Sequence, residues 1–414
     1  MTVWVGKHGG RDVVIAPTAG HLFTLYTRER GFPVFDCLWG PRWLYDPNSK
    51  HLRKFYNVLK KLSERAESYV NACDYDIEGS VIGYNIIRHF GDTGRAYRVK
   101  FSTLTREEIS RAFNNMLPLD WNNIESGLAR HVLDWVWGIN VSRALTEIYG
   151  RVFGDRMVLS AGRVQSPTLL ELVRRQLERG AFVPEVRFTV SARVSYGGME
   201  YKLVPDFEPY ERLEDAAELV RGLREAGYLI VERVERRTLR LEPPPPFNLT
   251  ELQLEAARAF GYSPARTLEI AESLYLDSLI SYPRTNSEKI PPVIDNRSIL
   301  RRLTSLPGLG DYASELLRRG LVTPREGAGE DPAHPAIHPT GYKPTKKLSR
   351  EESNVFELVV RRYLASFYPS ARVDEVVYTL RDPKTGARFK LAGRRVTSKE
   401  WLRVYYYRGV TESE

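Results

Sequence analysis

A tyrosine followed directly by proline and arginine is the feature of this sequence best suited to covalent chemistry. Tyr282 closes the apolar run 279–282, and Pro283 and Arg284 follow it. Because proline biases the preceding residue toward extended backbone, we expect a short strand that ends at Tyr282. A free phenol has a pKa of about 10, and a neighbouring guanidinium stabilises both the phenolate and a phosphate that it attacks. The pattern therefore permits a covalent tyrosyl phosphate, and equally a core tyrosine beside a solvated arginine.

A second cluster carries carboxylates at every second position. Asp74, Asp76 and Glu78 follow residues 67–73, which are typical of a buried strand, and helical spacing begins at Ser80. If the extended backbone continues past residue 73, all three side chains face one side at the carboxyl edge of a sheet. Such oxygen ligands, without histidine or cysteine, suit Mg²⁺ in phosphoryl transfer. The alternative is an acidic loop that caps the following helix.

The composition favours a globular protein with a polyanionic partner. The chain has 414 residues, 42% of them hydrophobic, which is enough for two or more domains with cores. Its net charge of +9 favours a polyanionic partner. Arginine outnumbers lysine and suits bidentate phosphate contacts. The only cysteines, Cys37 and Cys73, exclude a disulfide framework and a Cys₄ zinc site. Neither a membrane-spanning run nor a signal peptide is evident, so we expect a protein of the reducing cytoplasm.

The elements that must position these side chains change in kind along the first half of the chain. Residues 1–118 alternate apolar strands with helical stretches, which predicts an α/β domain. Residues 119–185 have helical spacing, and their apolar face, with its two tryptophans, is predicted to be core. Residues 186–204 alternate around a Gly-Gly pair, which indicates a hairpin, and residues 229–241 predict a further strand with arginines on one face.

The second half predicts a helical block enclosed by strands. The proline run 243–246 forms a stiff connector. Helices are predicted over 248–276, with Asn248 as a cap and Ser263 opening the second helix, and over 350–367. Strands are predicted over 376–380, 388–391 and 401–407. The resulting domain boundaries are 1–118, 119–185, 186–245 together with 371–414, and the inserted block 246–370.

The two clusters together resemble the type IA DNA topoisomerases. Residues 74–79 resemble the toprim acidic motif of that family, and residues 279–286 resemble its active-site tyrosine motif. Further matches occur in family order: Gly20-His21-Leu22, the helix segment 134–140 followed by Arg143, the SxGRVQ-like segment 160–167, and His334-Pro335-Ala336-Ile337-His338-Pro339-Thr340.

The resemblance implies a fold of α/β plus α plus β type with several domains. These are a toprim α/β domain, a helical DNA-contacting domain, a β-rich arch and an inserted helical domain that carries the tyrosine. Together they would form a partial toroid, in which the tyrosine domain lifts from the toprim domain to admit DNA. The expected partner is single-stranded or negatively supercoiled DNA, and the expected location is the cytoplasm, with the nucleoid.

The resemblance also implies a reaction. Tyr282 would cleave one DNA strand through a 5′-phosphotyrosine and religate it, relaxing supercoils without ATP. Arg284 and His334 would assist catalysis, with His338 a weaker candidate. The Mg²⁺ ligands would be Asp74, Asp76 and Glu78, and the DNA-binding residues would be Ser160, Ala161, Gly162, Arg163, Val164, Gln165, Ser166 and Arg143.

The sequence departs from the family at both ends. The toprim domain of the family normally opens with a strand that ends in an active-site glutamate, and we find no counterpart before Lys7. Ser80 replaces the usual second acidic residue, and Ile77 replaces a common arginine. After Glu414 the family continues into a helical segment that closes the toroid. Three explanations fit: a misassigned start, a split gene whose partner chain completes the toroid, or a degenerate paralogue.

Two other classes of function remain open. The first is a DNA-binding relic that binds single strands in a salt-sensitive way but forms no covalent adduct. The second is a metal-dependent nuclease or primase-like enzyme that uses the toprim carboxylates alone. The second class leaves the tyrosine motif and the segments 160–167 and 334–340 unexplained.

Overall fold

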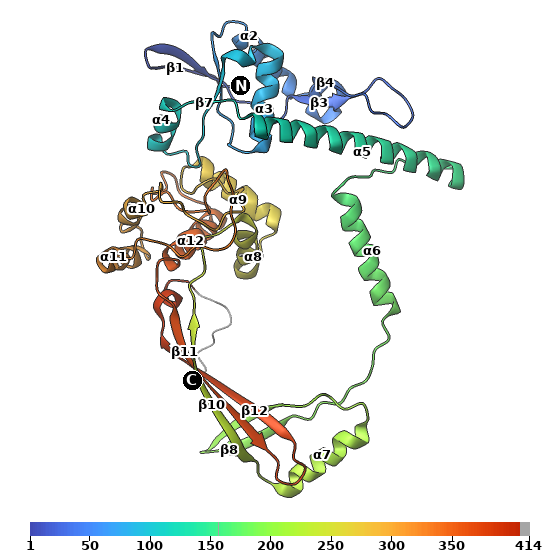
Figure 1. The fold of residues 1–414 in the computed structure, drawn as a ribbon, viewed down its shortest axis with the longest axis vertical. Helices are drawn as coiled ribbons and strands as arrows, with labels where there is room; N and C mark the ends of the chain where they lie inside the picture. The colour runs from blue at the N-terminus through green and yellow to red at the C-terminus, as the bar shows by residue number, and fades with distance from the viewer. Residues whose placement is uncertain (156, 406–414) are drawn as a thin grey trace. The chain divides into compact units, whose positions relative to one another are not determined.

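The computed structural model describes residues 1–155 and 157–405. The chain forms two compact units, residues 1–182 and residues 183–414 (Figure 1). Among the described residues, no helix is both long and apolar enough to cross a bilayer.

A small sheet in the first unit positions the acidic segment. Strands β5 (Tyr69–Asn71) and β6 (Ala96–Arg98) pair in parallel, and β7 (Leu117–Pro118) pairs with β6 in antiparallel fashion. Helix α3 (Ile77–Phe90) connects the two parallel strands. The other elements that precede residue 115 are β1 (Trp4–His8), β2 (Arg11–Ile15), β3 (Phe23–Tyr26), β4 (Leu38–Pro41), α1 (Arg42–Tyr45), η1 (Pro47–Ser49), α2 (Leu52–Ser63), η2 (Thr93–Arg95) and α4 (Arg106–Asn114).

Two long helices complete the first unit. Helix α5 (Trp121–Phe153) begins at the cap Asp120, whose side chain accepts a hydrogen bond from the Asn123 N–H, and ends at Gly154, whose φ is +70°. Helix α6 (Gln165–Ala181) follows. The prediction that the apolar face of residues 119–185 is core is wrong for most of α5. Trp137 is 38% exposed, and the buried residues of the helix are Ile124 and Gly127. Helix α3 packs against the first turns of α5, and burial is concentrated there.

A five-stranded antiparallel sheet, in the order β10-β11-β12-β9-β8, forms one part of the second unit. The predicted hairpin is confirmed, since Gly197 and Gly198 have φ of +60° and +81°, which suits a tight turn. Arg236 and Arg237 are consecutive on the regularly paired strand β10, where successive side chains face opposite sides. Arginines therefore lie on both faces of β10 and not on one face as predicted. The bounds are β8 (Ala192–Tyr196), β9 (Met199–Pro205), α7 (Leu213–Ala226), β10 (Ile230–Leu241), β11 (Ala371–Arg381) and β12 (Arg388–Ser398).

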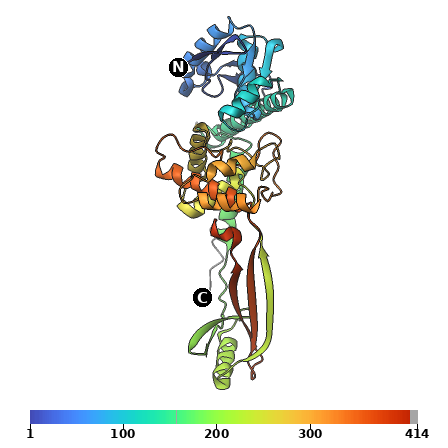
Figure 2. The same ribbon diagram turned by 90° about the vertical axis from the view of Figure 1, so that its left-hand side faces the viewer.

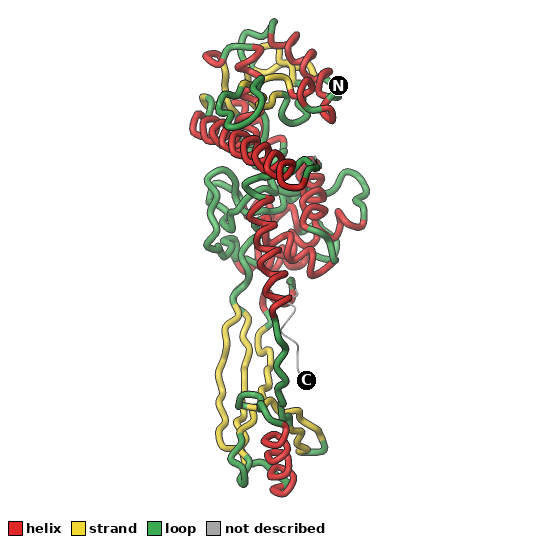
Figure 3. Tube along the Cα trace, turned by 90° about the vertical axis from the view of Figure 1, so that its right-hand side faces the viewer, coloured by secondary structure: helices red, strands yellow, loops and turns green. Residues whose placement is uncertain are grey.

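The helices between β10 and β11 form the other part of the second unit, and they gather at the end of the sheet where β10 ends and β11 begins (Figures 2 and 3). The predicted caps are confirmed: Asn248 Oδ1 accepts the Glu251 N–H at 2.8 Å, and Ser263 caps the next helix. The helices are α8 (Leu249–Phe260), α9 (Pro264–Leu276), α10 (Asn296–Leu303), α11 (Gly310–Arg319) and α12 (Arg350–Ala365).

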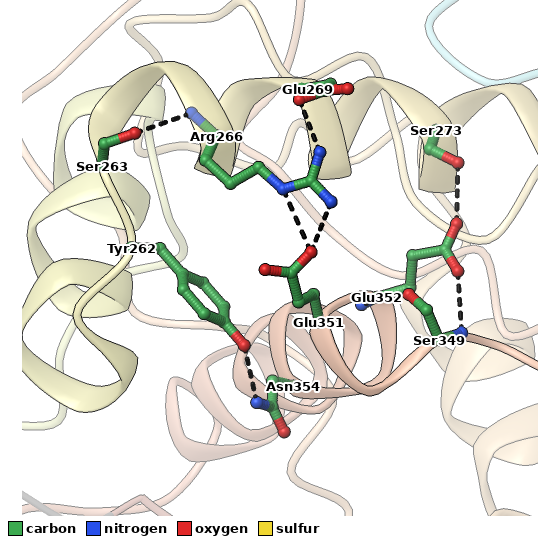
Figure 4. Close-up of polar contacts among 9 residues, drawn as sticks. All are labelled: Tyr262, Ser263, Arg266, Glu269, Ser273, Ser349, Glu351, Glu352 and Asn354. Carbon is green, nitrogen blue, oxygen red and sulfur yellow. Dashed lines mark hydrogen bonds and ion pairs between the residues drawn. The ribbon is translucent and has the colours of Figure 1, made fainter.

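Polar contacts hold α9 against α12 (Figure 4). Arg266 Nε donates to Glu351 Oε2 at 3.0 Å, and Ser273 Oγ donates to Glu352 Oε1 at 2.9 Å. Glu352 also closes a capping box with Ser349 at the start of α12. These contacts fix the helix that directly precedes the tyrosine segment.

Two predicted strands are wrong. Residues 400–403 form a short 3₁₀ helix, η3 (Glu400–Arg403), where a strand over 401–407 was predicted; residues 406 and 407 lie outside the described part. Residues 279–282 form only an isolated bridge, Ile280 with Pro339. The proline has no N–H to continue a ladder, so the pairing stops after one residue.

Candidate active site

The tyrosine segment and the HPAIHPT segment are joined by hydrogen bonds. The Ser281 N–H donates to the His338 carbonyl at 2.9 Å, and the His338 N–H donates back to Ser281 Oγ at 3.0 Å. The Thr340 N–H donates to the Leu279 carbonyl at 3.0 Å. Two motifs more than fifty residues apart in sequence therefore form one local structure.

The ring of Tyr282 lies between two aromatic neighbours. Its centroid is 4.6 Å from the His334 ring and 5.3 Å from the Tyr275 ring. The residue is only 4% exposed. His334 is held by its backbone: its N–H donates to Asp331 Oδ1 at 3.2 Å, and its carbonyl accepts from the Thr285 hydroxyl at 3.3 Å. The structure thus brings the predicted nucleophile and the predicted histidine together.

Arg284 lies beside an acidic side chain of α9. Its Nε and Nη2 donate to Glu272 Oε1 at 2.8 and 2.5 Å, and both side chains are partly exposed. Residue-type patterns alone did not single out Glu272. The ion pair orients the guanidinium, and Glu272 would compete with a phosphate for its Nε and Nη2 donors.

His338 is a structural residue in this arrangement. It is 3% exposed, and its Nδ1 lies 3.0 Å from the Pro339 carbonyl, so the tautomer that protonates Nδ1 donates there. Its backbone supplies the hydrogen bonds to Ser281 described above. His338, the weaker of the two predicted catalytic histidines, therefore has a structural role in holding the tyrosine segment.

The acidic loop after β5 is shaped by a buried arginine that sequence reasoning missed. Arg98, on β6, is 1% exposed, and its guanidinium donates to the carbonyls of Asn71 (2.9 Å), Cys73 (2.6 Å) and Asp74 (2.5 Å). Burial lowers the pKa of Arg98. Gly79 packs so closely on the loop that an added Cβ would lie 2.1 Å from the Asp74 carbonyl oxygen.

The carboxylates of this loop do not alternate along a strand as predicted. Strand β5 ends at Asn71, and Asp76 is instead the cap of α3, with Oδ1 accepting the Gly79 N–H at 2.6 Å. The carboxylate therefore caps the helix, which was the alternative interpretation of the sequence. Helix capping satisfies exposed N–H groups that an extended continuation would leave without partners.

Glu78 lies in the first turn of α3 among three basic side chains. Its Oε2 is 2.7 Å from His21 Nε2 and 3.3 Å from His131 Nε2, and its Oε1 is 3.2 Å from Arg130 Nη1. Burial alone would raise the pKa of Glu78, but the hydrogen bond with His21 and the neighbouring positive charges lower it overall. Burial also lowers the pKa of His21, which favours the neutral imidazole.

The chemistry of these donors is compatible with Mg²⁺ at Asp74 and Asp76. Both carboxylates are half-buried at the carboxyl end of a parallel strand, and such oxygens are the ligands that Mg²⁺ prefers. Glu78 is the exception, because its oxygens are engaged by imidazole and guanidinium groups.

The SxGRVQ-like segment precedes α6 and packs on α5. The Ala161 N–H donates to Ser142 Oγ at 2.9 Å, and Gln165 Nε2 donates to Ser160 Oγ at 3.0 Å. Arg163 forms an ion pair with Asp134 of α5. The side chain of Ser166 accepts from the Gly162 N–H at 3.2 Å, and Val164 is 81% exposed.

Arg143 of α5 has a different environment. Its Nη1 donates to the carbonyls of Gly31 (2.7 Å) and Glu29 (3.2 Å), so it supports the loop between β3 and β4. The acidic, tyrosine and SxGRVQ-like motifs are thus each built into a defined local structure. The fold and these motifs define a multidomain protein of mixed α/β type, with an acidic loop at the carboxyl end of a parallel strand.

Comparison with known proteins agrees with this class. Residues 118–414 match the family described as DNA topoisomerase, and residues 7–104 match the Toprim domain. DNA topoisomerase 1 of Aeropyrum pernix is 49% identical over 98% of this chain and 60% of the relative. DNA topoisomerase 1 of Pyrococcus horikoshii is 38% identical over 96% of this chain and 58% of the relative.

A solved structure supports the same assignment. Full-length topoisomerase I from Thermotoga maritima superposes with a TM-score of 0.70 at 25% identity, covering 94% of this chain and 63% of that chain. The chain belongs to the DNA topoisomerase family, in its type IA branch, which confirms the resemblance and the mixed, multidomain fold class. It spans about 60% of the length of the A. pernix relative.

Proposed function

We propose that this chain cleaves and religates one strand of DNA through Tyr282, and so changes DNA topology without ATP. The proposal rests on the hydrogen bonds that join the tyrosine segment to the HPAIHPT segment. They accompany a separation of 4.6 Å between the ring centroids of Tyr282 and His334. Family membership supports the same reaction.

In the proposed step the Tyr282 oxygen attacks the phosphorus of a phosphodiester. A tyrosine–phosphorus ester forms with the 5′-phosphate, the bond to the 3′ oxygen breaks, and that oxygen leaves as a hydroxyl while the phenol loses its proton. Arg284, released from Glu272, stabilises negative charge on the transferring phosphate. One ester replaces another, so the step is close to neutral in energy, and religation reverses it.

Access to the phenol is part of the proposal. Tyr282 is 4% exposed, so DNA reaches it only after the residues that cover it move. The ring neighbours Tyr275 and His334 lie in the same block 246–370 as Tyr282, so they must shift within that block. The predicted lifting of the block would separately admit the DNA. His334 would contact the DNA near the scissile bond.

Asp74 and Asp76 are the residues proposed to hold Mg²⁺, with Glu78 as the third predicted ligand. When bound, the ion would neutralise phosphate charge and steady the free 3′ end. Arg98 keeps the loop that carries the carboxylates in place by donating to its carbonyls. The DNA strand would be held by the segment 160–166 and by Arg143.

The partner of the reaction would be single-stranded or negatively supercoiled DNA in the nucleoid. A second chain that completes a toroid belongs to the same proposal. Relaxation of a negatively supercoiled plasmid with Mg²⁺ and no nucleotide is the test. We expect relaxation by the wild-type chain and loss of it in the Asp74→Asn, Asp76→Asn double variant. DNA binding without relaxation, unchanged by a second chain from the same genome, would contradict the proposal and favour the binding relic.

A further inference from the structure

Two histidines in the first unit, to which the proposed reaction gives no role, form a cluster with Glu78, the third predicted Mg²⁺ ligand. His21 lies between β2 and β3, Glu78 in α3 and His131 in α5, and one ligand atom from each lies within 4.8 Å of the others. Three segments far apart in sequence thus converge on one carboxylate oxygen, Glu78 Oε2. Convergence of this kind fixes ligands before an ion arrives, which lowers the cost of binding.

The distances from the two histidines to Glu78 Oε2 are close to those around a small divalent ion, and the two histidine nitrogens lie within 4.8 Å of each other. Ligand atoms about 2.0–2.1 Å from a tetrahedral ion lie about 3.3 Å apart, and His131 Nε2 is 3.3 Å from Glu78 Oε2. His21 Nε2 lies at 2.7 Å, so it would withdraw by roughly half an ångström, exchanging a hydrogen bond for a metal bond. Within the described part of the chain, His131 Nε2 is buried and has no hydrogen bond of good geometry.

The surroundings hold the rings in place. The His21 and His131 rings meet edge to face at 4.9 Å, and Trp39 lies 5.8 Å from the His131 ring. Arg130 occupies the other oxygen of Glu78 at 3.2 Å, which orients the carboxylate. The positive charges of Arg130 and of Arg42, which lies near His21, disfavour the binding of a cation here. The affinity should therefore fall below that of closed structural zinc sites.

We propose that His21, Glu78 and His131 form a binding site for a divalent transition-metal ion of the imidazole-preferring kind, such as Zn²⁺ or Co²⁺. Imidazole nitrogens select these ions, whereas Mg²⁺ prefers the all-oxygen set of Asp74 and Asp76. The ion would link three segments: the one before β3, helix α3 and helix α5. Glu78 would then bind this ion and not Mg²⁺. Binding does not depend on DNA cleavage, so it can fail or succeed separately.

The test is a titration of the full chain, without DNA, with Co²⁺ in excess Mg²⁺, followed by visible absorption. We expect one saturating Co²⁺ per chain, and at least about tenfold weaker binding in His21→Gln and in His131→Gln. His51→Gln removes an exposed histidine elsewhere in the first unit and should bind like wild type. The Asp74→Asn, Asp76→Asn variant should also retain the ion.

A second readout needs no variant that might misfold. X-ray absorption at the zinc edge of the wild-type chain loaded with one Zn²⁺ should show two imidazole ligands together with an oxygen ligand. No saturable binding, binding unchanged in both histidine variants, or loss of binding in the aspartate variant would overturn the proposal. So would a zinc-edge spectrum without imidazole ligands.

Discussion

At the scale of single residues, several side chains hold the backbone around the proposed reacting groups. Arg98 does this for the acidic loop, because one buried guanidinium donates to three successive parts of the loop at Asn71, Cys73 and Asp74. An ammonium in its place would have fewer donors and no fork geometry. Asp76 caps α3 by accepting the Gly79 N–H. The His338 N–H donates to Ser281 Oγ and so holds the tyrosine segment.

Replacing Arg98 by lysine should therefore loosen the acidic loop without unfolding the chain. We expect a cost of roughly 1–3 kcal/mol in local stability, from carbonyls left without a donor. Hydrogen exchange measured by mass spectrometry should show faster exchange in peptides that cover residues 71–80. Arg95→Lys is the matched control, because Arg95 is an exposed neighbour that pairs with Asp92 on the surface. Equal exchange in both variants would show that Arg98 does not hold the loop.

The capping box at the start of α12 gives a second residue-scale prediction, about pH. The Ser349 backbone and hydroxyl, together with the Ser273 hydroxyl, hold the pKa of Glu352 below its ordinary value of 4.5. A lowered folded pKa means that the stabilisation is present above about pH 4.5 and is lost as the pH falls through the folded value. Ser349→Ala should cost about 1 kcal/mol at neutral pH.

Thermal unfolding of wild type and Ser349→Ala across this pH range checks the sign. The difference in Tm should be largest at neutral pH and shrink in acid as Glu352 is protonated. Ser353→Ala, an exposed position one turn later on the same helix, serves as the control. A difference in Tm that grows in acid would contradict the role of the charged Glu352 in the box.

At the scale of elements, helix and loop contacts decide where the functional loops sit. Gly79 of α3 is the clearest case, since a Cβ there would approach the Asp74 carbonyl oxygen to 2.1 Å. Gly138 of α5 is also helical, but a Cβ there would lie 3.6 Å from its nearest neighbour, the Ala161 carbonyl oxygen. The two glycines therefore separate a steric role from helix propensity.

Gly79→Ala should displace the acidic loop and lower the stability of the first unit by roughly 1–3 kcal/mol, because the clash is with backbone that cannot rotate away. Gly138→Ala should be neutral or stabilising by up to about 1 kcal/mol, as alanine favours helix. Urea denaturation followed by far-UV circular dichroism compares them. Equal effects of the two substitutions would contradict the close packing of α3 on the loop.

Local signals in the sequence predicted several of these elements well. The caps at Asn248 and Ser263 and the turn at Gly197-Gly198 were predictable because their physics involves residues close in sequence. The alternation of Asp74 and Asp76 was misleading, because capping of α3 outweighs a longer strand. The tyrosine and histidine motifs were found in sequence, but their hydrogen-bonded pairing required the fold.

Other features had no sequence signal strong enough to find them. His21 was noticed only within a short motif, and nothing in the helical spacing of α5 distinguished His131 as its partner. Their meeting at Glu78 depends on how three segments pack. The exposure of Trp137 could not be read from spacing either, because a periodic apolar face does not reveal what, if anything, covers it.

At the scale of the whole molecule, the net charge of +9 predicts electrostatic attraction to DNA. Phosphate contacts release counterions, so binding to a single strand should weaken as salt rises. Arg163→Gln should lower the slope of log K against log salt by about 0.7, the share of one phosphate contact on a single strand.

Fluorescence anisotropy with labelled single-stranded DNA at several salt concentrations measures this slope. Arg174→Gln on α6 is the control, since Arg174 is an exposed arginine that pairs with Glu171. The same slope in wild type and Arg163→Gln would remove Arg163 from the proposed DNA-binding residues, while leaving the proposed nucleophile untouched.

The central claim, that Tyr282 becomes joined to DNA, is tested most directly by trapping the covalent adduct. The full chain is incubated with Mg²⁺ and single-stranded DNA labelled at its 3′ end, so that the label stays on the strand that keeps the 5′-phosphate, and the reaction is quenched with detergent. The account predicts a labelled protein band in wild type, absent in Tyr282→Phe and present in Tyr275→Phe, whose ring lies beside that of Tyr282. DNA binding without a labelled band, or a band that persists in Tyr282→Phe, would contradict it.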